Sequence, residues 1–403
     1  MQRRVLTVLI ITQVVGTIGV GIAPSIGVLL ADEVMHSEIG AGLARTASTL
    51  GAAIAGVPLG TLAARSGRRA ALASGWWIAA LGSAVLIAAA QLSLAVPLFI
   101  GLLLIGTGSA VSLQSRFAAT DLAEPHRRGR SLALVVWVGT LGSVLGPNLG
   151  VPGGWIAGAT GLNVFAGAFL IAAACLALAG AIVFLALRPD PLLVLRERLA
   201  AAPAPAGPHR GRIARVIGEL RVNAQARYAF IAIVTAQIVM VSVMTMTPVH
   251  LSHQGGSITL VGLTISLHVV GMYALAPVVG LIADRAGARF SIAIGIAVFV
   301  ASLVVGAARP SDTGWIVTSL ILLGIGWSFV NVAGSALFSA VISDETRATS
   351  QGGVDALSNL SGAAAALAAG PLMMLTSFSA LSIAAIVVLV PLAVLTARRV
   401  RTP

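Results

Sequence analysis

Apolar residues in this sequence come in long runs, which short polar segments separate. Most runs reach the roughly 20 residues that a helix needs to cross the ~30 Å apolar core of a lipid bilayer. They lack the alternation over about ten residues that is typical of membrane β-strands. The pattern therefore predicts an all-α membrane protein with twelve transmembrane helices, at residues 5–30, 40–64, 70–91, 95–117, 130–151, 162–187, 227–249, 259–283, 290–308, 313–340, 349–371 and 375–397.

One long polar segment, residues 188–226, divides these helices into two sets of six. It contains the run APAPAGP, a composition typical of spacers, and then RIARVIGELRV, where arginines stand between apolar residues at helical spacing. The second stretch predicts either an amphipathic helix on anionic inner-leaflet lipids or a plain connecting helix. We expect an N-terminal bundle at 1–187, a cytoplasmic linker at 188–226 and a C-terminal bundle at 227–403.

Composition and charge support a membrane protein with a defined orientation. Charged residues make up 9% of the chain, against about 25% in soluble domains. The net charge is +12, and all the basic residues are arginines. Apart from Arg45, Arg116 and Arg309, they lie in one set of alternate loops and at the termini, which is the bias of cytoplasmic loops. We expect a multi-pass protein of the inner (plasma) membrane with both termini cytoplasmic, and no nucleic-acid partner.

Two short loops repeat each other. GTLAARSGRR at 60–69 and GLIADRAGAR at 280–289 are 220 residues apart, and the Gly-Pro pairs at 146–147 and 370–371 are 224 apart. The agreement indicates that the two sets of six helices are pseudo-repeats of one unit. Many secondary transporters are built from such repeats, with a binding site between the halves.

The first loop resembles the signature loop of the major facilitator superfamily. The helix at 130–151 contains GTLGSVLGPNLG, which is similar to a Gly-x-x-x-Gly-Pro-x-x-Gly motif of the twelve-helix drug:proton antiporter branch. The resemblance implies the major facilitator fold, transport by alternating access and a small-molecule substrate. It also implies the proton gradient as energy source, with no cofactor, and we expect a monomer.

The resemblance further implies that the two loops act as conformational latches between the halves. The acid of this loop would sit against the unpaired N–H groups at the start of a helix in the opposite half. Asp284 would address the start of the helix near Gly129 and Arg130, whereas Ala64 has lost the acid that would address the region of Ser350. The predicted latch residues are Gly60, Arg65, Gly67, Arg68, Arg69, Gly280, Asp284, Arg285, Gly287 and Arg289.

A second conformational element lies in the helix at 130–151. Gly142, Gly146 and Gly150 share a face without side chains, and Pro147 removes a backbone hydrogen bond and bends the helix. The resemblance implies a seal between the halves on the side away from the cytoplasm, which would favour export. Simple close packing is the alternative.

Two ionisable residues within the apolar runs are candidates for proton coupling. Asp355 has Gln351 and Asn359 on its helical face, and His268 lies about 24 Å before Asp284 along its helix. Ionisable residues are costly inside a membrane, so each is a functional hypothesis. The alternatives are a polar helix end that faces cytoplasmic water for Asp355 and a hydrogen-bonded core imidazole for His268.

The N-terminal half departs from the drug-efflux pattern. The arginine usual near the start of the fourth helix is missing, because Leu102 or a neighbour stands there, and the first helix has no acid. Arg116 could interact with Asp121 or with an anionic ligand instead. His250 and His253 have metal-ligand spacing but no third ligand, so we expect no metal site.

The other substrate-cavity candidates are neutral side chains that suit an amphiphilic organic compound. With Arg116, they are Gln13, Gln114, Asn148, Gln237, Tyr273, Trp327, Asn331 and Asn359.

The leading hypothesis is therefore proton-coupled efflux of small amphiphilic compounds. The alternative is an importer, a symporter or uniporter, of a metabolite such as a vitamin or siderophore. A polytopic membrane enzyme is remote, because no polar loop except 188–226 could build an active site, and we expect no enzymatic activity. A nucleotide loop of the Gly-x-x-x-x-Gly-Lys-Ser/Thr type cannot exist in a chain without lysine.

Overall fold

The computed structural model describes residues 1–124, 128–199, 218, 220–342 and 344–398. In this part of the chain the regular elements are all helical, and 11 helical segments are long and apolar enough to cross a membrane. One of these, α3 (Glu38–Leu92), has 55 residues and holds two of the predicted spans, because Gly67 interrupts it with non-helical φ and ψ. The predicted all-α membrane fold is confirmed, and dividing α3 at Gly67 accounts for the predicted number of spans.

The chain forms two compact units, which we describe separately. The first contains Met1–Ala206 with Ser257–Ser266, and the second contains Gly207–Gly256 with Leu267–Pro403. The predicted division at 188–226 stays a prediction, and most of the predicted amphipathic stretch at 212–222 lies outside the described residues.

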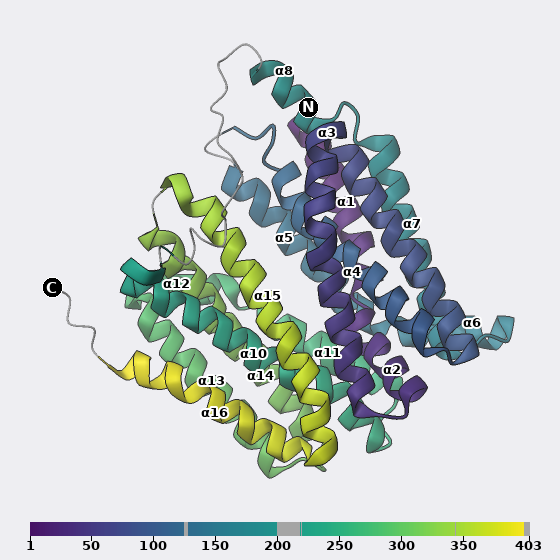
Figure 1. Cartoon of the computed structure of the whole chain (residues 1–403), viewed down its shortest axis with the longest axis vertical. Helices are drawn as coiled ribbons and strands as arrows, with labels where there is room; N and C mark the ends of the chain where they lie inside the picture. The colour runs from purple at the N-terminus through teal and green to yellow at the C-terminus, as the bar shows by residue number, and fades with distance from the viewer. Residues whose placement is uncertain (125–127, 200–217, 219, 343, 399–403) are drawn as a thin grey trace. The chain divides into compact units, whose positions relative to one another are not determined.

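In the first unit, α3, α4 and α7 run side by side (Figure 1). Its elements are α1 (Gln2–Val20), η1 (Ala23–Gly27), α2 (Val28–Met35), α3, α4 (Ala95–Ala118), α5 (Arg128–Leu145), η3 (Gly146–Leu149), α6 (Gly150–Thr160), α7 (Val164–Ala186), α8 (Pro191–Leu199) and the first half of α11 (Ile258–Tyr273).

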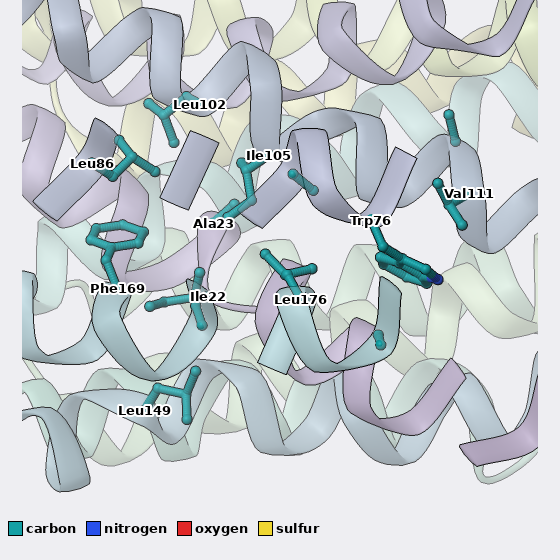
Figure 2. Packing of buried hydrophobic residues seen from close by; sticks show 14 of the residues in the cluster. Ile22, Ala23, Trp76, Leu86, Leu102, Ile105, Val111, Leu149, Phe169 and Leu176 are labelled. Carbon is teal, nitrogen blue, oxygen red and sulfur yellow. The ribbon is translucent and has the colours of Figure 1, made fainter. Parts of the chain in front are cut away.

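Small residues allow these helices to approach closely, as in other membrane bundles. The fully buried ring of Trp76 on α3 lies against Gly16 of α1, where an added Cβ would clash with it. Figure 2 shows Trp76 in the same buried cluster as Ile105 of α4 and Leu176 of α7. The core of the first unit is thus built from apolar stripes of several helices.

The second unit is organised around α10 (Ala224–His253), in which every residue from 239 to 249 is buried. Helices α14, α15 and α16 pack on α10 (Figure 1). Its other elements are the second half of α11, α12 (Ala276–Ala286), α13 (Ala288–Ala308), α14 (Thr313–Val341), α15 (Asp344–Leu375) and α16 (Phe378–Ala397).

Three predicted spans differ in detail from the observed helices. The span at 130–151 is divided into α5, the 3-10 turn η3 and α6, because Pro147 cannot continue the α-helical hydrogen bonds. The span at 259–283 is divided into α11 and α12, with Pro277 in the first turn of α12, where a missing N–H costs nothing. Helix α15 begins at Asp344, five residues before the predicted start at 349.

Candidate functional site

The loop at Gly67 is held to its own unit by an ion pair. Gly67 has φ 89° and ψ 172°, a conformation that is essentially confined to glycine. Directly after this turn, Arg68 Nε donates to Asp121 Oδ2 at 2.8 Å and Arg68 Nη1 donates to Gln114 Oε1 at 3.2 Å. The Arg68 and Asp121 side chains are 13% and 9% exposed, so water screens the pair weakly.

This network changes the expected partner of two side chains. We expected Arg116 as a possible partner of Asp121, but the structure pairs Asp121 with Arg68. Gln114, a candidate for substrate contact, also donates from Nε2 to the carbonyl of Gly56 at 3.4 Å. Its amide therefore lies within the Arg68 network. Arg116 is half-buried near the end of α4.

Asp190 is a loop residue that the sequence interpretation missed. Its Oδ2 accepts a hydrogen bond from the backbone N–H of Arg69 at 2.7 Å, and its Oδ1 accepts from the N–H of Leu192 at 2.9 Å. One carboxylate thus caps the first turn after Gly67 and also the start of α8. The signal was present in the sequence, because an Asp followed by Pro191 is typical of a helix start.

The second loop, at Gly287, has the same turn but different partners. Gly287 has φ 92° and ψ 145°. Arg289 donates from Nε to the carbonyl of Thr396 at 3.0 Å and from Nη2 to the carbonyls of Leu395 and Arg398, all at the end of α16. Its guanidinium also lies over the ring of Tyr228. Asp284 and Arg285, by contrast, are exposed. A cation at a helix C-terminus is favourable because unpaired carbonyls carry partial negative charge.

The glycine face of α5 packs directly on α1. A Cβ added at Gly142 would lie 2.5 Å from the carbonyl oxygen of Val14, and one added at Gly146 would lie 2.6 Å from the Cα of Gly21. These contacts involve backbone atoms, which cannot move aside as the end of a flexible side chain can. The two glycines therefore allow α1 and α5 to approach to backbone contact.

The end of this face, at η3, packs on the first turns of α11. Asn148 Nδ2 donates to Ser266 Oγ at 2.6 Å, and Ser266 Oγ donates to the carbonyl of Val144 at 2.6 Å. A Cβ at Gly262 would lie 2.6 Å from the carbonyl oxygen of Pro147. Asn148, a substrate-cavity candidate, is thus engaged in a contact between helices.

Gln13 lies in a buried polar cluster between α1, α4 and α5. It is 3% exposed, and its Nε2 donates to Ser112 Oγ. Thr17, one turn further along α1, donates to the carbonyl of Gly139 at 3.0 Å. Within the described residues, Gln13 Oε1 has no hydrogen-bond partner. The cluster therefore offers one buried acceptor in the first unit.

Three candidates of the second unit lie together. Trp327 Nε1 donates to Gln237 Oε1 at 3.2 Å, and the Tyr273 ring stands edge-on to Trp327 with centroids 5.8 Å apart. They come from α14, α10 and α11 respectively. Asn331 follows Trp327 by one helical turn on α14 and is half-buried. The structure thus brings three of the predicted residues together, from α10, α11 and α14.

His268 is fully buried and packed between helices. Its Nδ1 lies 2.7 Å from the carbonyl oxygen of Leu320 on α14. A Cβ at Gly324 would lie 3.2 Å from the same ring nitrogen. This environment favours the alternative of a hydrogen-bonded core imidazole, and proton coupling by His268 stays a proposal.

Asp355 and Asn359 are both exposed on α15. The Asn359 amide donates to the backbone carbonyl of Asp355 at 2.9 Å. Because α15 begins at Asp344, Asp355 is eleven residues into the helix, about 16 Å along it. Asp355 lies two residues after the start of the membrane-length segment Gly353–Leu375. A carboxylate at the edge of a span is a candidate for reversible protonation, since its charge state depends on how well water reaches it.

The two histidines with metal-ligand spacing have other environments. His250 Nε2 lies 2.7 Å from the carbonyl oxygen of Pro310, and its ring stacks on Phe378 with centroids 4.3 Å apart. Over the described residues, no group of three or more His, Cys, Asp or Glu side chains could hold a metal ion. His250 therefore contributes to packing at the end of α10.

Comparison with known proteins decides the family. The Major Facilitator Superfamily profile matches residues 8–257 and 229–403. The chain belongs to the Major Facilitator Superfamily. It is thus a multi-pass membrane protein and a secondary transporter rather than an enzyme, and its partner is a small-molecule substrate.

Individual relatives agree with this family. The chain is 35% identical over 406 residues to the uncharacterized MFS-type transporter YddS of Bacillus subtilis (strain 168), covering all of this chain and 92% of the relative. It is 27% identical over 372 residues to the riboflavin transporter RfnT of Brucella anthropi, covering 92% and 89% respectively. A bacterial homologue of the human lysosomal transporter Spinster shares the fold, with a TM-score of 0.72 at 15% identity over 98% of this chain and 96% of that chain.

Proposed function

We propose that this transporter exports small amphiphilic organic compounds from the cytoplasm in exchange for protons, by alternating access. The drug:proton antiporter branch is part of this proposal. The observation that carries it is the packing of the α5 glycine face, with η3, on the backbone of α1 and on the first turns of α11.

The physical argument concerns leak. An exporter works against a gradient, so the compound must not return through the side on which it is released. Gly146 lies within backbone contact of Gly21, and Pro147 lies equally close to Gly262, so these segments leave little room between them. Such packing supports a seal at the end of the spans remote from the termini.

Coupling is assigned to Asp355. It lies on the same face of α15 as Asn359 and Gly362, and its exposure allows contact with water. Its carboxyl would take up a proton in one state and release it in the other as its surroundings become drier or wetter.

A matched pair of glycine variants tests the seal in proteoliposomes with an imposed pH gradient and a fluorescent amphiphilic cation, ethidium. Gly146→Leu should abolish most uphill transport, because its side chain meets the backbone of Gly21. Gly154→Leu in α6 is the control, since an added Cβ there has no atom within 4 Å. Equal ethidium transport by both variants would contradict the seal.

A matched pair of acid variants tests the coupling. Asp355→Asn should abolish gradient-driven transport while ethidium exchange continues, because the neutral amide cannot carry the proton. Glu33→Gln, at an exposed acid near the end of α2, is the control. Uphill transport by Asp355→Asn at the unmodified rate would show that another group couples the proton.

A second candidate is import of a small metabolite. The riboflavin transporter relative favours it, as do the absence of an acid in the first helix and of an arginine near Leu102. Riboflavin uptake into the same proteoliposomes separates the two functions. Riboflavin movement in the same direction as the protons supports import by symport. Riboflavin movement in the opposite direction to the protons supports export by antiport.

Topology and assembly complete the proposal. We propose that both termini face the cytoplasm, that the chain works as a monomer in the plasma membrane, and that anionic inner-leaflet lipids contact its arginine-rich loops. Cysteine labelling at Met1 and at Ser257, in otherwise cysteine-free protein, tests the orientation. The two positions should be labelled from opposite sides of the membrane.

A further inference from the structure

The second unit contains two half-buried amides beside an aromatic pair. Gln237 accepts from Trp327, and Tyr273 stands against the same indole. Asn331 lies one turn after Trp327. All four side chains are half-buried in helices that cross the membrane.

The Trp327 contact fixes the orientation of the Gln237 amide. An indole N–H can only donate, so the amide oxygen must face Trp327 and the amide nitrogen must face away. Among the described residues, the Gln237 amide nitrogen and the Asn331 side chain have no hydrogen-bond partner. Hydrogen-bonding groups in an apolar bundle are costly unless they are paired, so these amides favour a polar partner from outside the fold.

Gly362 of α15 packs closely on the Gln237 side chain. A Cβ there would lie 3.3 Å from Gln237 Nε2 and 3.2 Å from its Cγ, in tight contact. A larger side chain at 362 would cover the N–H group and displace Gln237 from Trp327. The glycine thus leaves room for the Gln237 side chain in the orientation that bonds Trp327.

We infer that Gln237, Trp327 and Tyr273 form a subsite for a planar, uncharged heteroaromatic ring with carbonyl groups on its edge. The ring packs against the indole of Trp327, and an edge carbonyl accepts from the Gln237 amide, with Asn331 as a second polar contact. The subsite is neutral, so a charged ring such as that of ethidium would be desolvated there without a counter-charge and should bind elsewhere in the protein. This inference rests on the proposed transport of small amphiphilic compounds, and it names the part of such a compound that the second unit binds.

Two planar tricyclic probes test the subsite by equilibrium dialysis against the full-length protein in detergent. Lumichrome has carbonyl groups on one edge of its ring, whereas phenazine has none. The unmodified protein should bind lumichrome about tenfold more tightly than phenazine, which corresponds to the hydrogen bonds at the edge. Gln237→Leu should remove this preference while phenazine binding stays, an outcome that general loss of structure would not give.

Trp327→Leu should weaken the binding of both probes about tenfold, because stacking on the ring is lost. Trp327→Phe, which keeps an aromatic ring, should retain part of the affinity. Trp315→Leu is the matched control, since Trp315 lies on the same helix, twelve residues earlier, and is 46% exposed. Size-exclusion chromatography confirms that each variant is folded.

Three results would overturn the subsite: no lumichrome binding by the unmodified protein, equal affinity for the two probes, or equal effects of Trp327→Leu and Trp315→Leu. Ethidium transport in proteoliposomes is independent of these measurements. If it persists while lumichrome does not bind, the subsite is wrong and the proposed transport stands.

Discussion

The loops at Gly67 and Gly287 have the same backbone turn and opposite electrostatics. Both glycines have φ near 90°, and both are followed two residues later by an arginine, Arg69 or Arg289. The first loop has Arg68 where the second has Ala288, and the second has Asp284 where the first has Ala64. Each copy thus carries one charge that the other lacks.

The difference shows what each loop is attached to. In the first unit, Arg68 binds Asp121 and the carboxylate of Asp190 caps the N–H of Arg69, so acids just after α4 and just before α8 fix the loop to its own unit. In the second unit, Arg289 binds the end of α16 and leaves Asp284 exposed. The turn beside Ala64 is capped by Asp190, which contacts α3 and the start of α8, and the predicted latch to the region of Ser350 stays a prediction.

The largest difference between the loops should appear at the turn glycines. Gly67→Ala should lower stability by about 4 kcal/mol, because an alanine at this φ is strained and its Cβ would lie 2.6 Å from Asp190 Cγ. Gly287→Ala should cost about 2 kcal/mol, from strain alone, since a Cβ there has no atom within 4 Å. Thermal unfolding in detergent measures both. If both variants lost a similar free energy of unfolding, the Asp190 side chain would be free to move away from the added Cβ at position 67.

The next largest effect concerns the ion pair of the first loop. Arg68→Ala should cost about 3 kcal/mol, because it leaves the largely buried Asp121 without a counter-charge. The double variant with Asp121→Asn should recover part of this loss, since the uncompensated charge is then removed. If the two single losses simply add, the pair does not hold the loop.

Asp190 should have a smaller effect. Asp190→Ala should cost about 1 kcal/mol, the usual value for the loss of a helix cap, because the N–H groups of Arg69 and Leu192 both lose their acceptor. Asp284→Ala, at an exposed acid, is the comparison and should change the melting temperature little. Equal melting temperatures for the two variants would show that the cap does not stabilise the loop.

The smallest free-energy change is expected for the latch itself. An exposed carboxylate at a helix start contributes about 0.3–1 kcal/mol. Ala64→Asp should therefore raise the population of the cytoplasm-closed state, and Asp284→Ala should lower it, by roughly two- to fivefold. Distances between spin labels on the ends of α4 and α14 that the proposed topology places in the cytoplasm report this ratio. An unchanged distribution in both variants would leave the repeated loop as a trace of ancestry.

The amino-acid sequence determined the helical membrane fold, the repeat and the superfamily. Hydropathy reports on each segment separately, so span length and the breaks at Pro147 and Gly67 can be predicted locally. The contact between Gln237, Trp327 and Tyr273 could be predicted from the sequence only in part. The sequence marked each as a polar or aromatic residue within a span, but not that α10, α11 and α14 place them together.

Only the tertiary structure decided which charges pair. Arg68 and Asp121 are 53 residues apart, and Arg69 and Asp190 are 121 apart, so no local pattern links them. The sequence predicted Arg116, five residues away, as a partner of Asp121, whereas helix packing brings Arg68 to it. An ion pair depends on the distance between its charges in space, and in a helix bundle that distance is set by which helices are neighbours. The sequence by itself determines only where each helix begins, ends and turns.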